Sequence, residues 1–571
     1  MPSAPRAPRD RYVELHCHST FSLLDGASSP EALVTRAAEL GHPALALTDH
    51  DDLGGVVRFA QAAAEAGLGG IVGVELTLEV PAARRGAAGA AGDVERTHLV
   101  LLAETREGYG NLATLVTRAR MDRPRGRAGV PLDVVAAHAR GLTALTGCPR
   151  GWVPARLAAG DERGAREALG TLADVFGGHL AVECWDHGLA EERRAAARLL
   201  ALARAAGAPW VPTGDVHYAR ASGRVVHDVL CAVRAGRTLD AMGTRLRPSG
   251  EWHLRSAAQV RRRWAGAHGD AAAAEGLRAT LAVAERCAFR LEDLRPSLPA
   301  FPLPPGVSED EYLARLVEQG ASERWAGAAA ARRTAAHDRQ IAHELDVIRR
   351  LGLAGYFLIV WDLVRFARRE GILCQGRGSA ANSVVCYCLG ITAVDPVRMG
   401  LLFERFLSDD RQEPPDIDVD FAHRERERVL QYVYERYGRD HAAMVCEHIT
   451  YRGKSAVRDA ARALGFSVEQ ANALSLLSDR FSAKATAERL RAGVAGAAAA
   501  AGDAAGKAVV AAAGAGGATW PAGGAPPDEI GTPRPEPVTP PAPDVVRLPA
   551  GGPPPAAAPP APVAAALGRS V

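Results

Sequence analysis

The sequence predicts an α/β fold that opens with a seven-stranded barrel. From about residue 12 to about residue 218, short apolar runs are each followed by a polar turn, and Ala/Leu/Arg-rich stretches with helical spacing separate several of them. Strands that alternate with helices are typical of an α/β domain, and seven strands suggest that the sheet closes into a barrel. The predicted strands are residues 12–15, 44–48, 70–75, 98–103, 142–146, 180–183 and 210–213.

A connecting region follows this domain. Residues 220–305 contain a second helical pattern around 276–288 and end in the Pro-rich run 296–305, which predicts a domain boundary. Beyond it, Ile341, Leu345 and Ile348 recur at helical spacing, and Gly352 predicts the end of that amphipathic helix. A second helix is expected over residues 356–370, before Gly371.

The next segment predicts a loop, a strand and another helix. A Gly/Ser loop at 375–383 precedes a carboxylate-bearing strand at 416–421, and Val429, Val433 and Tyr437 then mark one face of a helix. The globular pattern persists to about residue 490. From residue 492 the composition changes to Ala, Gly and Pro, which cannot bury a core, so the tail 492–571 is expected to be disordered.

Composition limits the class of protein. With 571 residues there is room for about three or four domains. No stretch is apolar for long enough to span a bilayer, and the first residues lack a signal-peptide pattern, so we expect a cytoplasmic protein that does not insert into membranes. The nine scattered cysteines predict reduced thiols. A net charge of +2 means that nucleic-acid binding must depend on local basic surface.

The first candidate site gathers potential metal ligands at strand ends. His16 and His18, two residues apart after the first predicted strand, would point to the same side of an extended chain. Because barrel strands bring their carboxyl ends to one face, ligands that follow other strands should converge there. Such a donor set suits Zn²⁺, or Mn²⁺ or Fe where carboxylates dominate, and predicts hydrolytic phosphoester chemistry. The further candidates are Asp49, His50, Glu75, Cys148, Asp215 and His217.

The second candidate site combines a Gly/Ser loop with alternating carboxylates. In PPDIDVDF, a strand would place Asp416, Asp418 and Asp420 on one face. Upstream, GRGSAANS supplies backbone N–H groups that can approach a triphosphate, with Ser379 as a further donor and Arg377 as a phosphate partner. Together they predict a nucleotidyl-transfer site in which carboxylates hold two Mg²⁺ ions.

The first half of the chain resembles the PHP (polymerase and histidinol phosphatase) domain. The motifs are HCHSTFSLLDGA, TDHDDLGG, GVEL, THLVLLA, TGC and GDVHY. The resemblance implies a distorted TIM-like barrel and a complete set of metal ligands, with Asp49, Asp51 and Asp52 supporting the ligands or forming turns. The implied ligands are His16, His18, Asp25, His50, Glu75, His98, Cys148, Asp215 and His217.

The second half resembles the palm of bacterial C-family DNA polymerases, the DnaE-type alpha subunits. The motifs are GYFLIVWDLVRFAR, GRGSAANS, ITAVDP, LLFERFLS, PPDIDVDF and ITYRGKSAVRDAARALG, and their wording is most similar to the error-prone paralogue used in damage tolerance. The resemblance implies an α+β palm similar to that of polymerase beta, then a partial helical thumb. It implies catalytic, Mg²⁺-binding Asp416 and Asp418; nucleotide-binding Gly376, Arg377, Gly378 and Ser379; and DNA-binding Arg452, Lys454 and Arg458.

The resemblance also implies a domain order and partners. The expected partners are primer–template DNA and dNTPs, together with the sliding clamp and other damage-response proteins that would bind through regions not in this sequence. The expected domains are the PHP domain at 1–225, the connecting region at 226–305, the palm at 306–428, a partial thumb at 429–491 and the disordered tail at 492–571.

The sequence departs from the family pattern near residue 490. The family's third palm aspartate and its fingers are not found, and the Ala/Gly/Pro tail resembles a GC-rich gene translated in a shifted frame. Without those parts, metal placement and substrate alignment both fail, so the chain as written is expected to have little or no polymerase activity.

Three alternatives remain open from the sequence. The PHP domain could act alone as a metal-dependent phosphoesterase or 3′–5′ exonuclease. The chain could instead represent part of a replicative alpha subunit. It could also be a non-catalytic fragment that only binds DNA or polymerase partners.

Overall fold

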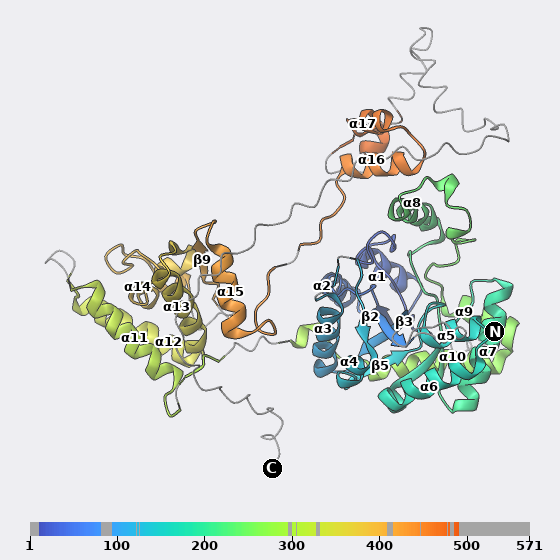
Figure 1. The fold of residues 1–571 in the computed structure, drawn as a ribbon, viewed down its shortest axis with the longest axis horizontal. Helices are drawn as coiled ribbons and strands as arrows, with labels where there is room; N and C mark the ends of the chain where they lie inside the picture. The colour runs from blue at the N-terminus through green and yellow to red at the C-terminus, as the bar shows by residue number, and fades with distance from the viewer. Residues whose placement is uncertain are drawn as a thin grey trace, which may run out of the picture. The chain divides into compact units, whose positions relative to one another are not determined.

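The structure, a computed structural model, describes most of the chain up to residue 491. The largest hydrophobic core cluster lies in the N-terminal α/β part, and another large cluster lies in the helical part from about residue 301. Figure 1 shows the elements of both parts. The predicted tail at 492–571 and Cys446 lie outside the described residues. Described are residues 11–81, 94–121, 123–124, 126–294, 300–303, 305–326, 332–407, 415–445, 447–476, 478–479, 485–489 and 491.

A curled seven-stranded sheet forms the N-terminal part and confirms the α/β prediction. The strand order is β1-β2-β3-β5-β6-β7, with β4 paired to β2. Neighbouring strands are parallel except at β3, which runs antiparallel to both β2 and β5. The strands are β1 Ala44–Leu47, β2 Gly69–Pro81, β3 Val94–Ala103, β4 Val130–Pro131, β5 Leu142–Leu145, β6 Leu180–Trp185 and β7 Trp210–Thr213.

The first predicted strand is wrong in detail. Residues 12–15 form no strand, and the seventh strand is instead the two-residue β4. The chain from Glu14 to His18 lies between the two edges of the sheet: Ala46 N–H donates to the Glu14 carbonyl at 2.9 Å, and Val216 N–H donates to the His16 carbonyl at 3.0 Å. With each side it forms a single isolated bridge, Glu14 with Leu45 and Cys17 with Val216, rather than a regular ladder. This segment therefore closes the curl.

Helices cover the outside of the sheet, as Figure 1 shows. Their apolar faces and the strands build a continuous core that includes Leu76, Leu101 and Leu172. α1 begins at a Ser29 cap, whose hydroxyl accepts from the Ala32 N–H. The helices are α1 Pro30–Glu39, α2 Val56–Glu65, α3 Arg106–Arg120, α4 Leu132–Ala137, α5 Trp152–Ala158, α6 Glu162–Phe176, α7 Ala190–Ala206, α8 Arg224–Ala235, α9 Ala257–His268 and α10 Asp270–Arg286.

The helical pattern predicted around 276–288 corresponds to α10, and this helix packs on the sheet. The Trp210 ring of β7 lies 5.1 Å from the Trp264 ring of α9, measured between centroids. Val13 N–H donates to the Thr280 hydroxyl of α10 at 3.3 Å. Helices of the connecting region thus complete the core of the N-terminal part.

The second core is formed by helices around a two-stranded sheet. α12 ends before Gly352 and α13 before Gly371, as the sequence predicts. β8 and β9 pair antiparallel, with Arg377 opposite Asp418. The elements are α11 Glu309–Arg324, α12 Ala335–Arg350, α13 Ala354–Arg369, β8 Cys374–Arg377, α14 Val384–Cys388, β9 Asp418–Phe421 and α15 Arg426–Tyr437, and two further helices follow, α16 Gly453–Ala463 and α17 Val468–Leu476.

Two composition-based expectations can be compared with the described residues. The eight cysteines among them are all free, in agreement with the expectation of reduced thiols. In the part of the chain that the structure covers, none of the helices is long and apolar enough to cross a bilayer.

Substitution of Gly276 tests whether α10 packs against the core of the N-terminal part. A Cβ at this position would lie 2.5 Å from the Trp210 ring, so Gly276→Ala should overpack the contact and destabilise the N-terminal part by about 1–3 kcal/mol. Gly266→Ala on α9 is the matched control: a Cβ there meets nothing within 4 Å, and the better helix propensity should stabilise by about 1 kcal/mol. Urea denaturation measures both, and equal midpoints would contradict the packing.

Candidate functional site

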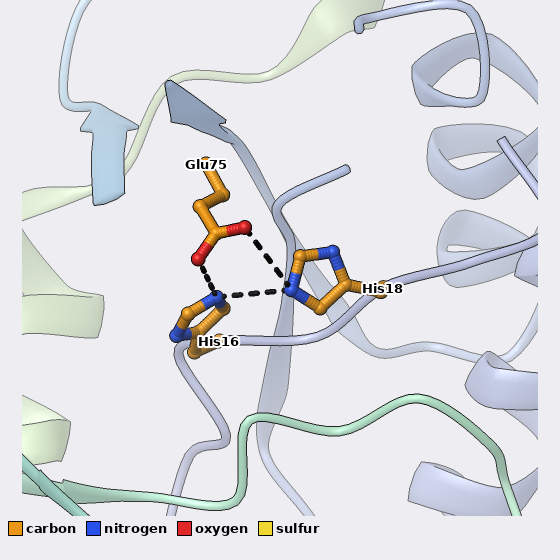
Figure 2. A group of neighbouring side chains, drawn as sticks. All are labelled: His16, His18 and Glu75. Carbon is orange, nitrogen blue, oxygen red and sulfur yellow. Dashed lines mark hydrogen bonds and ion pairs between the residues drawn. The ribbon is translucent and has the colours of Figure 1, made fainter. Parts of the chain in front are cut away.

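The innermost group of potential ligands is His16, His18 and Glu75. The two imidazole Nε2 atoms lie 3.1 Å apart, and they lie 3.5 Å and 3.8 Å from the two carboxylate oxygens of Glu75. Figure 2 shows all three side chains pointing toward one another. The histidines come from the segment that closes the sheet and Glu75 comes from β2, so closure of the curl assembles the group.

Glu75 also faces ligands from the other side. Its carboxylate oxygens lie 3.0 Å from Nδ1 of His50 and 2.7 Å from Nδ1 of His98. The Cys148 thiol lies 3.3 Å from the same nitrogen of His98. His98 belongs to the antiparallel strand β3, so it reaches the site from within a strand rather than from a parallel strand end.

A neighbouring group contains His18, Asp215 and His217. Nε2 of His18 lies 3.6 Å from the Asp215 carboxylate. Asp215 has φ +41°, a left-handed conformation that is uncommon for aspartate and typical of constrained functional turns. Nε2 of His217 lies 3.7 Å from Asp25, which brings the last of the nine predicted ligands to the edge of the cluster.

The histidines and carboxylates of the cluster shift one another's pKa values. Burial alone would lower the pKa of His16, but Glu183 and Glu75 outweigh it and raise that pKa well above its usual value. Burial alone would raise the pKa of Glu75, but His98, His16 and His50 outweigh it and hold that pKa well below its usual value. The imidazoles and carboxylates thus stabilise one another's charges, and a metal ion bound among them would displace the imidazole protons.

Two further observations fit a metal. Burial and the Arg247 guanidinium lower the pKa of His217 to about 4, so this imidazole is neutral near pH 7, the form that can bind a metal once Arg247, which now lies 2.7 Å from its Nε2, moves away. The buried Nε2 of His98 has no hydrogen-bond partner in the structure. Imidazole, carboxylate and thiol donors that converge in this way are the donor set expected for Zn²⁺ or Mn²⁺.

Sequence reasoning missed Glu183, which supports the cluster from behind. Its carboxylate lies 2.7 Å from Nδ1 of His16 and accepts from the Thr213 hydroxyl at 2.6 Å. Such a contact fixes the ring and leaves Nε2 facing Glu75 and His18. The available signal was a charged residue inside the otherwise apolar strand LAVECW.

Asp49, which the sequence expects to support ligands, lies beside Ser19 and Ser22. It accepts hydrogen bonds from both serine hydroxyls at 2.7 Å. The Ser22 hydroxyl in turn lies 3.0 Å from Nδ1 of His18. Asp49 therefore orients His18 through a serine.

The second site is built on the β8–β9 pair. The antiparallel register sets Arg377 opposite Asp418, and the guanidinium lies 3.4 Å from Asp418 and 3.1 Å from Asp420. The hydrogen bond to Asp420 and the charges of Asp418 and Asp416 raise the pKa of Arg377. Arg377 thus pairs with two carboxylates while a third, Asp416, lies close enough to act on its pKa, so negative charge exceeds positive charge among these residues. β9 begins at Asp418, and exposed Asp416 precedes it.

The Gly/Ser loop turns directly beside Asp418. Gly378 has φ +67°, a left-handed conformation that favours glycine, and a Cβ there would lie 3.5 Å from the Asp418 carboxylate. Gly376 N–H donates to the Ile391 carbonyl at 2.7 Å, which ties β8 to the segment after α14. Half-buried Ser379 follows in the same turn. The loop and the aspartate strand, about forty residues apart in the sequence, are adjacent in space.

A buried carboxylate that the sequence did not reveal fixes this loop. Glu344 of α12 accepts from the Ser383 hydroxyl at 2.7 Å and from the backbone N–H groups of Val384 and Val385 at 3.0 Å. It thereby caps the N-terminus of α14, where a negative charge is favourable. Nothing in its sequence surroundings marks it, because its partners lie about forty residues away.

The predicted DNA-binding residues lie at the start of α16. Arg452, Lys454 and Arg458 are all exposed, and Lys454 and Arg458 are one helical turn apart. Exposed cations at this spacing are free to contact phosphates.

Comparison with known proteins agrees with both halves of the chain. The model of the PHP domain matches residues 14–187, and that of the bacterial DNA polymerase III alpha NTPase domain matches residues 311–511. An error-prone DNA polymerase of Mycolicibacterium paratuberculosis is 47% identical over 481 residues, and one of Cutibacterium acnes is 48% identical over 484 residues. The chain belongs to the DnaE-type family of bacterial DNA polymerases. Its match covers 83–84% of this chain and 41–42% of those two relatives.

Likeness to solved structures is weaker. An amidohydrolase from Chromobacterium violaceum is 21% identical, with a TM-score of 0.26, over 36% of this DnaE-type chain and 87% of that chain. At this TM-score the likeness adds nothing to the assignment. The resemblance predicted from the motifs is confirmed, including the similarity to error-prone relatives.

Glu183 provides a test of the metal cluster in this DnaE-type chain. Glu183→Gln should weaken metal binding about 10–100-fold, because the contact that orients His16 loses its charge. Glu192→Gln is the matched control, since Glu192 holds buried His187 at 2.9 Å in the same manner outside the cluster. Competition titration with a metal indicator measures both affinities. Equal affinities for the two variants would contradict the role of Glu183.

Glu344 provides a test of the Gly/Ser loop. Glu344→Ala should leave buried donors of α14 without an acceptor, at a cost of about 1–3 kcal/mol, whereas Glu344→Gln retains one acceptor oxygen and should cost less. Hydrogen exchange of the α14 amides measures the effect locally. Unchanged protection in Glu344→Ala would show that the cap does not stabilise the loop.

Proposed function

We propose that this chain supplies the PHP and palm portions of an error-prone DNA polymerase that acts in damage-tolerant synthesis and repair. The observation that carries the proposal is the β8–β9 register, in which Gly378 turns beside Asp418. The relatives named error-prone DNA polymerase support it. Primer–template DNA and dNTPs are the proposed substrates, and the cytoplasm is the proposed location. The domain limits given from the sequence are part of this proposal.

In this proposal Asp416 and Asp418 hold Mg²⁺, which would activate the primer 3′-hydroxyl and neutralise charge on the leaving pyrophosphate. Arg377 neutralises the aspartates while no nucleotide is present and pairs with its phosphates when one binds, because a guanidinium matches phosphate oxygens well. The backbone at Gly378 and Ser379 can approach those phosphates, since the turn carries no bulky side chain. Arg452, Lys454 and Arg458 contact DNA phosphates.

Nucleotide binding tests the palm proposal in the 571-residue chain itself. Asp418→Ala should weaken Mg²⁺-dependent dNTP binding at least tenfold, a loss of about 1.4 kcal/mol or more. Arg377→Ala should weaken binding both with and without Mg²⁺. Isothermal titration calorimetry measures these affinities, and any primer extension by the chain should disappear in Asp418→Ala.

The control for this experiment is Asp346→Ala. Asp346 is a partly exposed carboxylate on α12 that pairs with Arg349 and Arg350 of its own helix. Its removal should leave dNTP affinity unchanged. Wild-type affinity in Asp418→Ala would overturn the proposed palm site.

A second candidate function is metal-dependent phosphoester hydrolysis at the PHP site. The observation that favours it is the buried convergence of imidazoles on Glu75, beside Asp215 and Cys148. We propose Zn²⁺ or Mn²⁺ as the ions held there. Such an ion would lower the pKa of a bound water, and His16, His18 and Glu75 would hold it.

Hydrolysis can be assigned to one site by paired variants. His16→Ala should abolish Zn²⁺- or Mn²⁺-stimulated release of nucleotides from the 3′ end of single-stranded DNA, whereas Asp418→Ala should retain that activity. Quantification of released mononucleotides measures the rates. Equal activity in His16→Ala and wild type, or no hydrolysis with either metal, would exclude this function.

A further inference from the structure

Asp25 faces two different sets of ligands. Its Oδ2 lies 3.7 Å from Nε2 of His217, within the PHP cluster. Its Oδ1 lies 3.5 Å from Nε2 of His227, on α8. The Cys231 thiol, one helical turn further along α8, lies 3.6 Å from the same His227 nitrogen. The two oxygens of one carboxylate therefore point to two groups of donors.

The group on α8 has the chemistry of a metal site. Asp25, His227 and Cys231 each offer a ligand atom, and these atoms lie within 4.8 Å of one another. His227 is 2% exposed and Cys231 is 5% exposed, so both donors are held in place by packing. Residues at i and i+4 on a helix project from the same face, which is how helices present paired ligands to one ion. A thiolate with an imidazole selects Zn²⁺ over Mg²⁺ or Mn²⁺.

We propose that Asp25, His227 and Cys231 bind a Zn²⁺ ion that adjoins the PHP metal cluster, with Asp25 as the bridging carboxylate. His227 and Cys231 lie outside the nine PHP ligands predicted from the sequence, so this position extends the cluster onto α8. Three protein ligands leave a fourth position of a tetrahedral ion open to water or to a substrate oxygen. The proposal concerns the N-terminal part alone and does not depend on nucleotidyl transfer at the palm.

Arg234 is the competing cation at this position. Its guanidinium lies 3.1 Å from Oδ2 of Asp25 and 3.8 Å from the Cys231 thiol. The Arg234 side chain is half exposed, so it can move into solvent when an ion binds. Binding also releases the thiol proton of Cys231, because the thiolate is the ligand. Removal of Arg234 should therefore tighten zinc binding at this position.

The test measures metal content of the purified 571-residue chain by mass spectrometry after equilibration with Zn²⁺. Cys231→Ser and His227→Ala should each lower the zinc content by one equivalent relative to wild type, and Arg234→Ala should retain it. Cys374→Ser is the matched control, because this half-buried cysteine belongs to none of the ligand groups among the described residues. Circular dichroism of each variant verifies the fold. Wild-type zinc content in both Cys231→Ser and His227→Ala would overturn the proposal.

Cobalt substitution identifies the thiolate directly. In a Cys148→Ser chain loaded with Co²⁺, Cys231 should still give a thiolate-to-cobalt absorption band, and the band should disappear in Cys148→Ser/Cys231→Ser. If Cys148→Ser fails to fold, the same band is compared between wild type and Cys231→Ser, where its intensity should fall by about half, since two thiolates reduce to one. A band that is unchanged on loss of Cys231, or absent from a folded Cys148→Ser chain, would contradict the site.

Discussion

Glu75 is the buried carboxylate on which the N-terminal part depends. Transfer of a carboxylate into a protein interior costs several kcal/mol unless positive charge or hydrogen bonds offset it. Here the imidazoles of His16, His50 and His98 surround it at 2.7–3.5 Å. The position of Glu75 along β2 makes this possible, because β2 pairs with β1 up to Val72 and with β3 from Gly73 onward. One side chain thus meets ligands from both neighbours.

The segment that closes the sheet, residues 14–18, brings two of the ligands to Glu75. The backbone from Glu14 to His18 bonds to β1 on one side and to the residues after β7 on the other, so His16 and His18 reach Glu75 only when the sheet is fully curled. The closed sheet thus brings these ligands together. Glu183 and Asp49 then fix the two imidazoles from outside. The cluster is both a product of the fold and a support for it.

The sequence predicted those features of the two sites that follow from the local spacing of residues. The two-residue spacing of His16 and His18 was enough to bring their Nε2 atoms together, and Asp418 and Asp420 lie on the predicted strand opposite the Gly/Ser loop, whereas Asp416 precedes that strand. Glu344 and the His227–Cys231 pair were missed because Ser383 and Asp25, which they face, lie far away in sequence. Glu183 was missed although its charge inside an apolar strand was a signal, because its partner His16 is distant. The strand predicted at 12–15 was wrong because apolar alternation does not reveal that this segment makes only isolated bridges to its neighbours.

The two sites differ in how deeply their side chains are buried and in how their charges are compensated. Most of the predicted PHP ligands are buried and offset one another's charge, whereas Asp416 and Asp420 are exposed, Asp418 is half-buried, and Arg377 lies beside Asp418 and Asp420. Anomalous diffraction from crystals of this chain grown with Mn²⁺ or Zn²⁺ tests the central claim most directly, that the buried cluster is a metal centre. The account predicts anomalous peaks between Glu75 and Nε2 of His16 and His18. Well-ordered side chains without any peak there would contradict it.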